Sequence, residues 1–147
     1  MIRLTPNDIA KHWDIIKYVL IKGDFITPDH RQRILNEMLH DLLCEKAQCF
    51  FRFGIEDRKI QTIIITRLEY SGRALEKFLY FKCLYSFKSA SREEWQDIWD
   101  FIRAFAKKTE CKYILMDSFN ERMFKILARL EIPEIYRTFR WDFNMEI

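Results

Sequence analysis

The chain has 147 residues, of which only 3 are glycine, while 13 Phe, 6 Tyr and 4 Trp make it 16% aromatic. Gly23, Gly54 and Gly72 lie too far apart to form a glycine-rich phosphate loop such as GxGxxG, so nucleotide-binding fingerprints of that kind are excluded. The formal net charge of +3 falls short of the concentrated basic field that dominates nucleic-acid affinity, so a nucleic-acid partner is unsupported.

Two amphipathic helices are predicted in the first third of the chain. Thr5 is a capping residue, Pro6 suits the first helical position and Asp8 is an acid three residues after the cap, so a helix should begin here and end at Gly23. The same signal at 27–29 predicts the start of a second helix. Its apolar stripe consists of Ile34, Leu35, Met38, Leu39, Leu42 and Leu43.

Three strands follow. The aromatic and β-branched segments 49–55 and 61–70 are separated by a charged stretch and predict a β-hairpin, with a short strand at 2–4 as a further candidate. After a turn at 71–73, segment 75–87 is nearly continuously apolar and is interrupted by Lys82, which predicts a strand that lies centrally in the sheet.

The last third alternates helices and strands. Ser91 and Glu94 form a capping box at the start of a helix, 113–116 is a short buried strand, and Ser118 or Asn120 caps another helix that Pro133 stops. Segment 136–143 closes the chain as a strand. A strand, helix, strand unit after a meander implies a mixed sheet with helices on both faces.

Length and patterning predict one soluble domain over residues 1–147. No apolar run approaches the roughly 18 residues of a membrane span and the first residues lack the apolar core of a signal peptide, so we expect a cytoplasmic protein with no membrane partner. The cysteines include no CxxC pair and the histidines form no Cys/His cluster, so no metal site is expected. Apolar strand contexts should raise the thiol pKa of Cys83 and Cys111.

The order of elements resembles that of the GNAT superfamily of N-acyltransferases over essentially the whole chain. In that family the strand after the third helix leads to an Asn that opens the fourth helix, and residues 116–120, ending at Asn120, fit this pattern. The resemblance implies an α/β (α+β) fold with a mixed, mostly antiparallel central sheet of six to seven strands and helices on both faces.

Two features of the family's chemistry are missing. The family holds the pyrophosphate of acyl-CoA with a glycine-containing loop before the third helix, whereas residues 87–94 contain no glycine and place Glu93 and Glu94 where they would repel an anion. The family's general acid is a Tyr seven residues after the Asn, and that position is Leu127 here.

An active site can still be assembled from other residues. The candidate catalytic groups are Glu69 as base and Tyr85 or Tyr136 as acid, and the candidate acyl-CoA-binding residues are Lys88, Ser89, Ser91, Arg92 and Asn120. Each of them also has an ordinary structural role, as a helix cap, a solvated strand end or a sheet residue. Because the family's chemical signatures are absent together, we favour the structural roles.

The sequence therefore supports two hypotheses. The first is a non-catalytic GNAT-like protein without a cofactor that binds another protein or joins a larger assembly, similar to small structural or accessory proteins of tailed phages, in the host cytoplasm or the virion. The alternative is an acyl-CoA-dependent N-acyltransferase that uses acetyl-CoA or another acyl-CoA and an atypical phosphate-binding loop. They differ in whether a CoA-sized cleft opens near Tyr85 and Leu115. Aromatic residues not needed for the core would form a protein contact surface: Phe25, Phe51, Phe101, Tyr18 and Trp13 or Tyr70.

Overall fold

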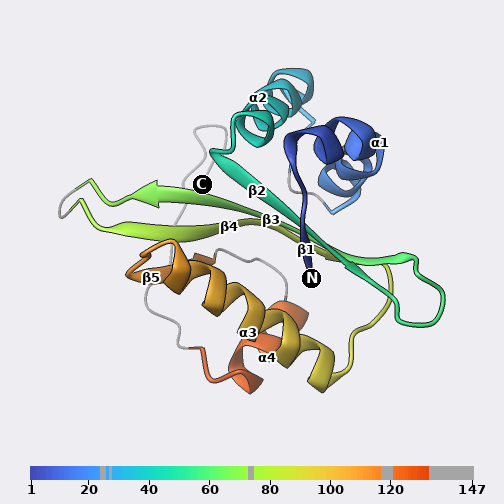
Figure 1. Cartoon of the computed structure of the whole chain (residues 1–147), viewed down its shortest axis with the longest axis vertical. Coiled ribbons are helices and arrows are strands. Elements are labelled where there is room, and N and C mark those ends of the chain that lie inside the picture. Colours follow the sequence, from blue (N-terminus) through green and yellow to red (C-terminus); the bar gives the residue numbers. More distant parts are fainter. Residues whose placement is uncertain (24–25, 27, 73–74, 117–120, 133–147) are drawn as a thin grey trace, which may run out of the picture. The chain divides into compact units, whose positions relative to one another are not determined.

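A computed structural model of the chain describes residues 1–23, 26, 28–72, 75–116 and 121–132 (Figure 1). The chain divides into two compact units, Met1–Asp117 and Ser118–Ile147, which are described separately. The first unit contains β1 (Ile2–Arg3), α1 (Pro6–Lys22), α2 (Arg31–Leu43), β2 (Ala47–Phe53), β3 (Ile60–Tyr70), β4 (Lys77–Ser86), α3 (Arg92–Lys108) and β5 (Tyr113–Met116). In the second unit the structure describes α4 (Glu121–Arg129). The single domain over 1–147 stays a prediction.

The strands of the first unit form one sheet in the order β1-β2-β3-β4-β5. Strands β1 to β4 pair antiparallel, and β5 pairs parallel to β4 after the crossover through α3. This confirms the mixed, mostly antiparallel sheet and the interior position of the third long strand. The described residues contain five of the six to seven strands expected, and segment 136–143 lies outside them.

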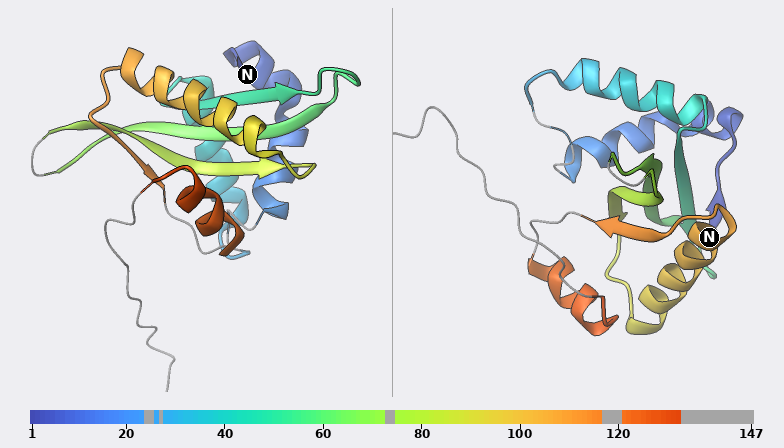
Figure 2. Two further views of the ribbon diagram at one scale, coloured as in Figure 1. Left: turned by 90° about the horizontal axis from the view of Figure 1, so that it is seen from below. Right: turned by 90° about the vertical axis from the view of Figure 1, so that its left-hand side faces the viewer.

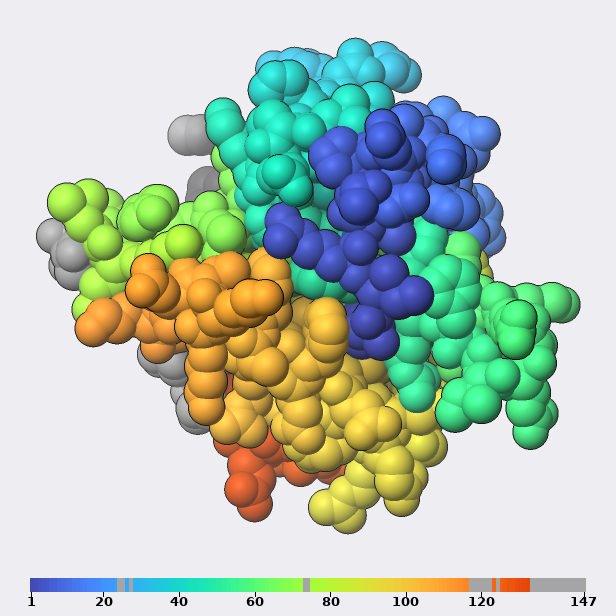
Figure 3. All heavy atoms as spheres, viewed as in Figure 1, coloured from blue at the N-terminus to red at the C-terminus, as the bar shows by residue number. Residues whose placement is uncertain are grey.

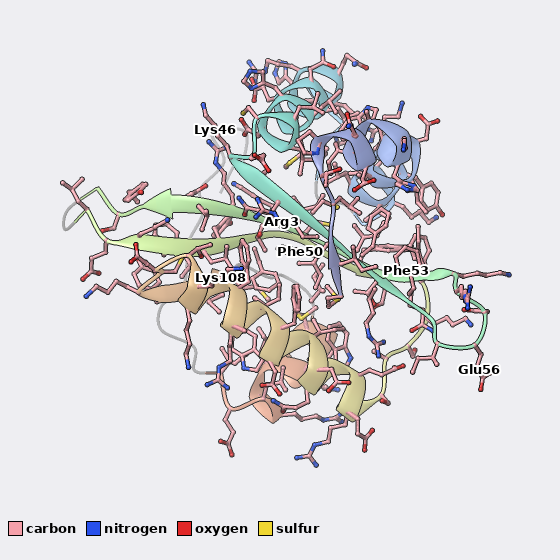
Figure 4. The ribbon with its side chains drawn as sticks, in the orientation of Figure 1. Arg3, Lys46, Phe50, Phe53, Glu56 and Lys108 are labelled. Atoms are coloured by element: carbon pink, nitrogen blue, oxygen red, sulfur yellow. The ribbon has the colours of Figure 1, made fainter. Side chains whose placement is uncertain are left out.

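Helices cover both faces of this sheet, as predicted (Figures 1 and 2). Helices α1 and α2 pack on one face, where Phe51, Ile63 and Ile65 are fully buried. Helix α3 packs on the other face, where Phe50 and Ile64 are fully buried (Figure 4). Side chains alternate between the faces of a strand, so β2 and β3 supply both cores at once, which explains why their sequences are nearly continuously apolar.

The observed ends of the helices can be compared with the capping signals in the sequence. Both predicted capping boxes are confirmed, at Thr5 with Asp8 and at Ser91 with Glu94. The predicted start of the second helix at 27–29 is wrong: α2 begins at Arg31, and its cap His30 has a φ of 60° and no capping side-chain hydrogen bond. The left-handed turn at His30 takes the place of the expected cap. Helix α4 ends at Arg129, before Pro133 is reached.

The predicted aromatic contact surface is not formed by those of its residues that pack into the core. Phe51 is fully buried and has the His12 ring at 5.4 Å, and Phe101 contacts Phe50 at a centroid distance of 5.4 Å. Trp13 packs against the core, Tyr18 and Tyr70 are exposed on separate elements, and Phe25 lies outside the described residues.

Among the described residues, the two most exposed large apolar side chains lie in the loops after β2 and before β4. Ile55, in the loop after β2, is 94% exposed, and Leu75, before β4, is 78% exposed. Figure 3 shows these two loop regions, green and yellow-green, projecting on opposite sides of the first unit. These residues therefore do not form one contiguous apolar patch. None of the helices that the structure describes has the length and hydrophobicity of a membrane-spanning segment.

Candidate functional site

Strand β4 contains one extra residue. Phe81 lies opposite Thr66 and Cys83 lies opposite Ile65, so Lys82 has no partner of its own on β3. This β-bulge reverses the alternation of side chains: Leu79 and Phe81 belong to the core beneath α3, whereas Cys83 belongs to the core beneath α1 and α2. Bulges of this kind recur next to active sites because they redirect side chains and end strand pairing.

The pairing of β4 with β5 ends at the same point. The last pair is Phe81 with Met116, and among the described residues no strand pairs with this side of β4 beyond it. Figure 2 shows β4 continuing past the end of β5. The Phe87 N–H donates to the Gln61 carbonyl of β3 at 2.9 Å, so by alternation the backbone groups of Leu84 and Ser86 point away from β3. The second half of β4 thus presents an edge that an extended, amide-bearing ligand can pair with.

After this edge the chain continues to the start of α3, where the carboxylate of Glu94 occupies the helix N-terminus. The Ser91 N–H donates to Glu94 Oε2 at 2.7 Å, and the Glu94 N–H donates to Ser91 Oγ at 3.2 Å. The backbone hydrogen bond from Ser91, followed by the Arg52 guanidinium, lowers the pKa of Glu94. Arg52 Nη1 lies 3.3 Å from Glu94 Oε1. The helix N-terminus therefore already holds a carboxylate.

Cationic side chains flank the same helix start. Lys88 Nζ lies 3.3 Å from Asp57 Oδ2 in the loop after β2, and hydrogen bonds from the Lys59 backbone and then from Lys88 lower the pKa of Asp57. Arg92, the first residue of α3, is exposed, as is Ser89. Lys88, Ser89, Ser91 and Arg92 therefore come together at one end of β4, whereas Asn120 lies outside the described residues.

No protein-family model and no curated protein matches the sequence. Solved structures do match the fold. A predicted acetyltransferase from Clostridium acetobutylicum, solved with acetyl-CoA, matches with a TM-score of 0.71 at 13% identity over 96% of this chain and 94% of its own. The chain has the GNAT fold.

Further neighbours with the GNAT fold have named activities. An aminoglycoside antibiotic 6'-N-acetyltransferase from Acinetobacter baumannii has a TM-score of 0.67 at 12% identity, covering 99% of this chain and 97% of its own. A ribosomal-protein-alanine N-acetyltransferase from Brucella melitensis has a TM-score of 0.67 at 10% identity, covering 97% and 98%. At these identities the likeness establishes the fold.

On this GNAT fold the candidate acid and base flank the bulge from opposite sides. Glu69 lies opposite Phe78, and its Oε1 is 3.5 Å from Arg67 Nε and 3.8 Å from Lys82 Nζ. Tyr85 lies opposite Ile63, six residues from Glu69 along β3, which is about 20 Å of strand. The structure therefore does not bring Glu69 and Tyr85 to one reacting atom.

Of the candidate catalytic residues, Tyr85 lies on the half of β4 beyond the end of β5 pairing, where it is half-buried and contacts the Phe87 ring at 5.1 Å. Tyr136 lies outside the described residues. The CoA-sized cleft near Tyr85 and Leu115 stays a prediction.

The sequence does not predict a polar hollow that the structure shows beside α2. It has a volume of about 430 Å³ and is lined by Asn36, Glu37, His40, Asp41 and Arg67. Arg67 Nη1 on β3 donates to Asp41 Oδ2 at 2.5 Å. No local pattern predicts this pair, because 26 residues separate its members. The sequence does contain one signal here: His40 and Cys44 are four residues apart, so a helix brings their side chains to the same face.

The prediction is confirmed for Cys83, which is buried in β4, whereas Cys111 lies outside the strands and is only half-buried. Burial raises the pKa of Cys83 well above its ordinary value, and the neighbouring Cys49 raises it further. Burial likewise raises the pKa of Cys49. Neither thiol is suited to act as a nucleophile at neutral pH.

Proposed function

We propose that this protein is an acyl-CoA-dependent N-acyltransferase with an atypical phosphate-binding loop. The observation that carries the proposal is the coincidence of the β4 bulge with the end of β5 pairing, because among the described residues it leaves an open strand edge that leads to a helix N-terminus. A neighbour with the same fold was solved with acetyl-CoA. The comparisons favour this alternative over the non-catalytic, phage-related interpretation, which gains no support from them.

The open edge suits the shape and chemistry of acyl-CoA. The arm that joins its phosphates to its sulfur is extended and carries amide groups, which pair with strand edges as a peptide does. The backbone groups of Leu84 and Ser86 point to that side. In our proposal they bind the arm while the phosphates lie toward α3, which keeps the thioester near the bulge at Lys82.

Side chains replace the missing glycine loop in this proposal. Lys88 and Arg92 supply positive charge for the phosphates, and the hydroxyls of Ser89 and Ser91 are additional donors. The Glu94 carboxylate opposes them and should weaken binding relative to a site without it. An acceptor amine would attack the thioester carbon of acyl-CoA, so that a C–N bond forms and the C–S bond breaks. Tyr85, on the half of β4 beyond β5, would protonate the leaving thiolate, and the proton lost by the amine would pass to solvent.

A thermal-shift titration with acetyl-CoA and longer acyl-CoAs tests the proposal. A ligand at 100 times its Kd adds about 2.7 kcal/mol to the free energy of unfolding, which raises the Tm of a chain of this size by roughly 5 to 10 °C. No shift with any acyl-CoA would overturn the proposal. A bound acyl-CoA should also release free thiol when a panel of polyamines, aminoglycosides and peptide amines is added.

A pair of variants tests where the phosphates bind. Lys88→Gln combined with Arg92→Gln should weaken acetyl-CoA binding at least tenfold, because two charge-assisted contacts are lost. Lys108→Gln is the matched control, since Lys108 is exposed at the other end of α3, about 24 Å away (Figure 4). Equal loss in both variants would show that overall charge, not this site, holds the phosphates.

A further inference from the structure

His40, Asp41 and Cys44 bring three different ligand atoms together at the end of α2. His40 Nδ1 lies 3.8 Å from Asp41 Oδ1 and 3.9 Å from Cys44 Sγ, and the three ligand atoms lie within 4.8 Å of one another. All three belong to one helical turn and its cap, so the helix itself sets their spacing. We propose that these residues bind a divalent transition metal, with Zn²⁺ as the best match.

The separations suit a tetrahedral ion. With metal bonds of about 2.0 Å to nitrogen or oxygen and 2.3 Å to sulfur, the ligand atoms of a tetrahedral Zn²⁺ lie about 3.3 to 3.6 Å apart. The two separations from His40 Nδ1 exceed this by about half an ångström or less, and the third, between Asp41 and Cys44, is at most 4.8 Å. Exposed side chains can close that gap by small rotations, and both His40 and Cys44 are exposed. The donor set of imidazole, carboxylate and thiolate favours zinc over magnesium or calcium.

The surroundings favour a cation at this place. The C-terminus of a helix carries a partial negative charge, and the last turns of α1 and α3 contain Lys22 and Lys107 with Lys108, respectively. The last turn of α2 contains His40 as its basic residue and neither Lys nor Arg. A bound metal would supply positive charge at this helix end, as lysine does in α1 and α3, in addition to the Arg67 guanidinium that already contacts Asp41.

The second carboxylate oxygen of Asp41 is already held. Arg67 donates to Asp41 Oδ2, so Oδ1 is the oxygen that faces His40. Outer partners of this kind orient a ligating carboxylate. His40 and Asp41 also line the hollow of about 430 Å³, which leaves space for water or another small ligand at the fourth position of the metal. None of the three ligands belongs to the proposed acyl-CoA edge, and the proposal does not depend on acyl transfer.

Titration of the reduced, full-length protein with Co²⁺ tests the site. We expect a thiolate-to-cobalt charge-transfer band and tetrahedral d–d bands that saturate at one metal per chain and disappear when Zn²⁺ is added. Cys44→Ser should remove the charge-transfer band, and His40→Ala should weaken binding at least tenfold. Cys111→Ser and His12→Ala are matched controls outside the cluster and should leave the spectrum and affinity unchanged.

Several outcomes would overturn the proposal. These are the absence of saturable binding, a charge-transfer band that survives in Cys44→Ser, and a stoichiometry of one metal per two chains. The last result would indicate a metal that bridges two exposed cysteines. Far-UV circular dichroism of each variant separates loss of binding from loss of the fold, and folded variants are expected because His40 and Cys44 lie on the surface.

Discussion

Replacing Glu94 by Gln should weaken the fold and strengthen acyl-CoA binding. The Glu94 carboxylate accepts a 2.7 Å hydrogen bond from the Ser91 N–H at the positive end of the α3 dipole. Anions in a first turn contribute about 0.3 to 1 kcal/mol, and the charged hydrogen bond adds to this. Glu94→Gln should therefore lower the free energy of unfolding by about 1 kcal/mol, or about 3 °C in Tm.

The same charge opposes phosphate binding. Two unit charges about 6 Å apart repel by about 0.7 kcal/mol in water and about 3 kcal/mol at an effective dielectric constant of 20. The Glu94 side chain is 33% exposed and has Arg52 beside it, so the repulsion should lie near the lower value, about 1 kcal/mol. Acetyl-CoA should then bind Glu94→Gln roughly fivefold more tightly than the unchanged protein.

Urea unfolding and calorimetric titration with acetyl-CoA measure the two effects on the same samples. Asp97→Asn is the control, because Asp97 is an exposed acid beyond the first turn of the same helix. It should change neither quantity much, and the gain in Glu94→Gln should shrink at high salt. Reduced stability without tighter binding would refute the placement of the phosphates at the start of α3.

Three further predictions concern the fold itself. Phe50→Ala should lower the free energy of unfolding by about 3 to 5 kcal/mol in urea, because the ring is fully buried and contacts Phe105 at 5.1 Å; a loss below about 1 kcal/mol would contradict the packing. Hydrogen bonds from Thr5 lower the pKa of Asp8 below its ordinary value of 3.8, so its stabilisation is present above that pH and is lost as the pH falls through the folded pKa. Asp8→Asn should therefore remove part of the acid-induced loss of Tm, and an unchanged pH profile would argue against the capping box. A thiol reagent should modify exposed Cys44 rapidly in the native protein and buried Cys49 only on unfolding, so Cys44→Ser should remove the fastest phase.

Features that depend on neighbouring residues were predictable from the sequence. The capping boxes at Thr5 and Ser91 involve side chains three residues from their backbone partners, so the sequence contains the whole interaction. The start of α2 was not predictable in this way. The chain turns at His30 with a positive φ, and the local signal at 27–29 did not set the helix boundary.

The features that the sequence does not predict depend on contacts between segments far apart in the chain. The sequence alone does not show that Phe51 is needed for the core, because this depends on β2 lying between β1 and β3 and being covered on both faces. The Arg67 and Asp41 pair joins β3 to α2, so neither residue signals the other in the sequence. In the sequence Lys82 is an interruption of an apolar strand, and only the strand register identifies it as a bulge.

The bulge at Lys82 connects the packing of the fold to its proposed function. Without the extra residue, strict alternation would turn Cys83 and Tyr85 toward α3 and remove both from the core beneath α1 and α2. With it, β4 supplies Phe81 to one core and Cys83 to the other within three positions. The same irregularity coincides with the end of β5 pairing and leaves the rest of β4 open on that side among the described residues. One inserted residue thus serves both cores and marks the start of the edge on which the acyl-CoA proposal depends.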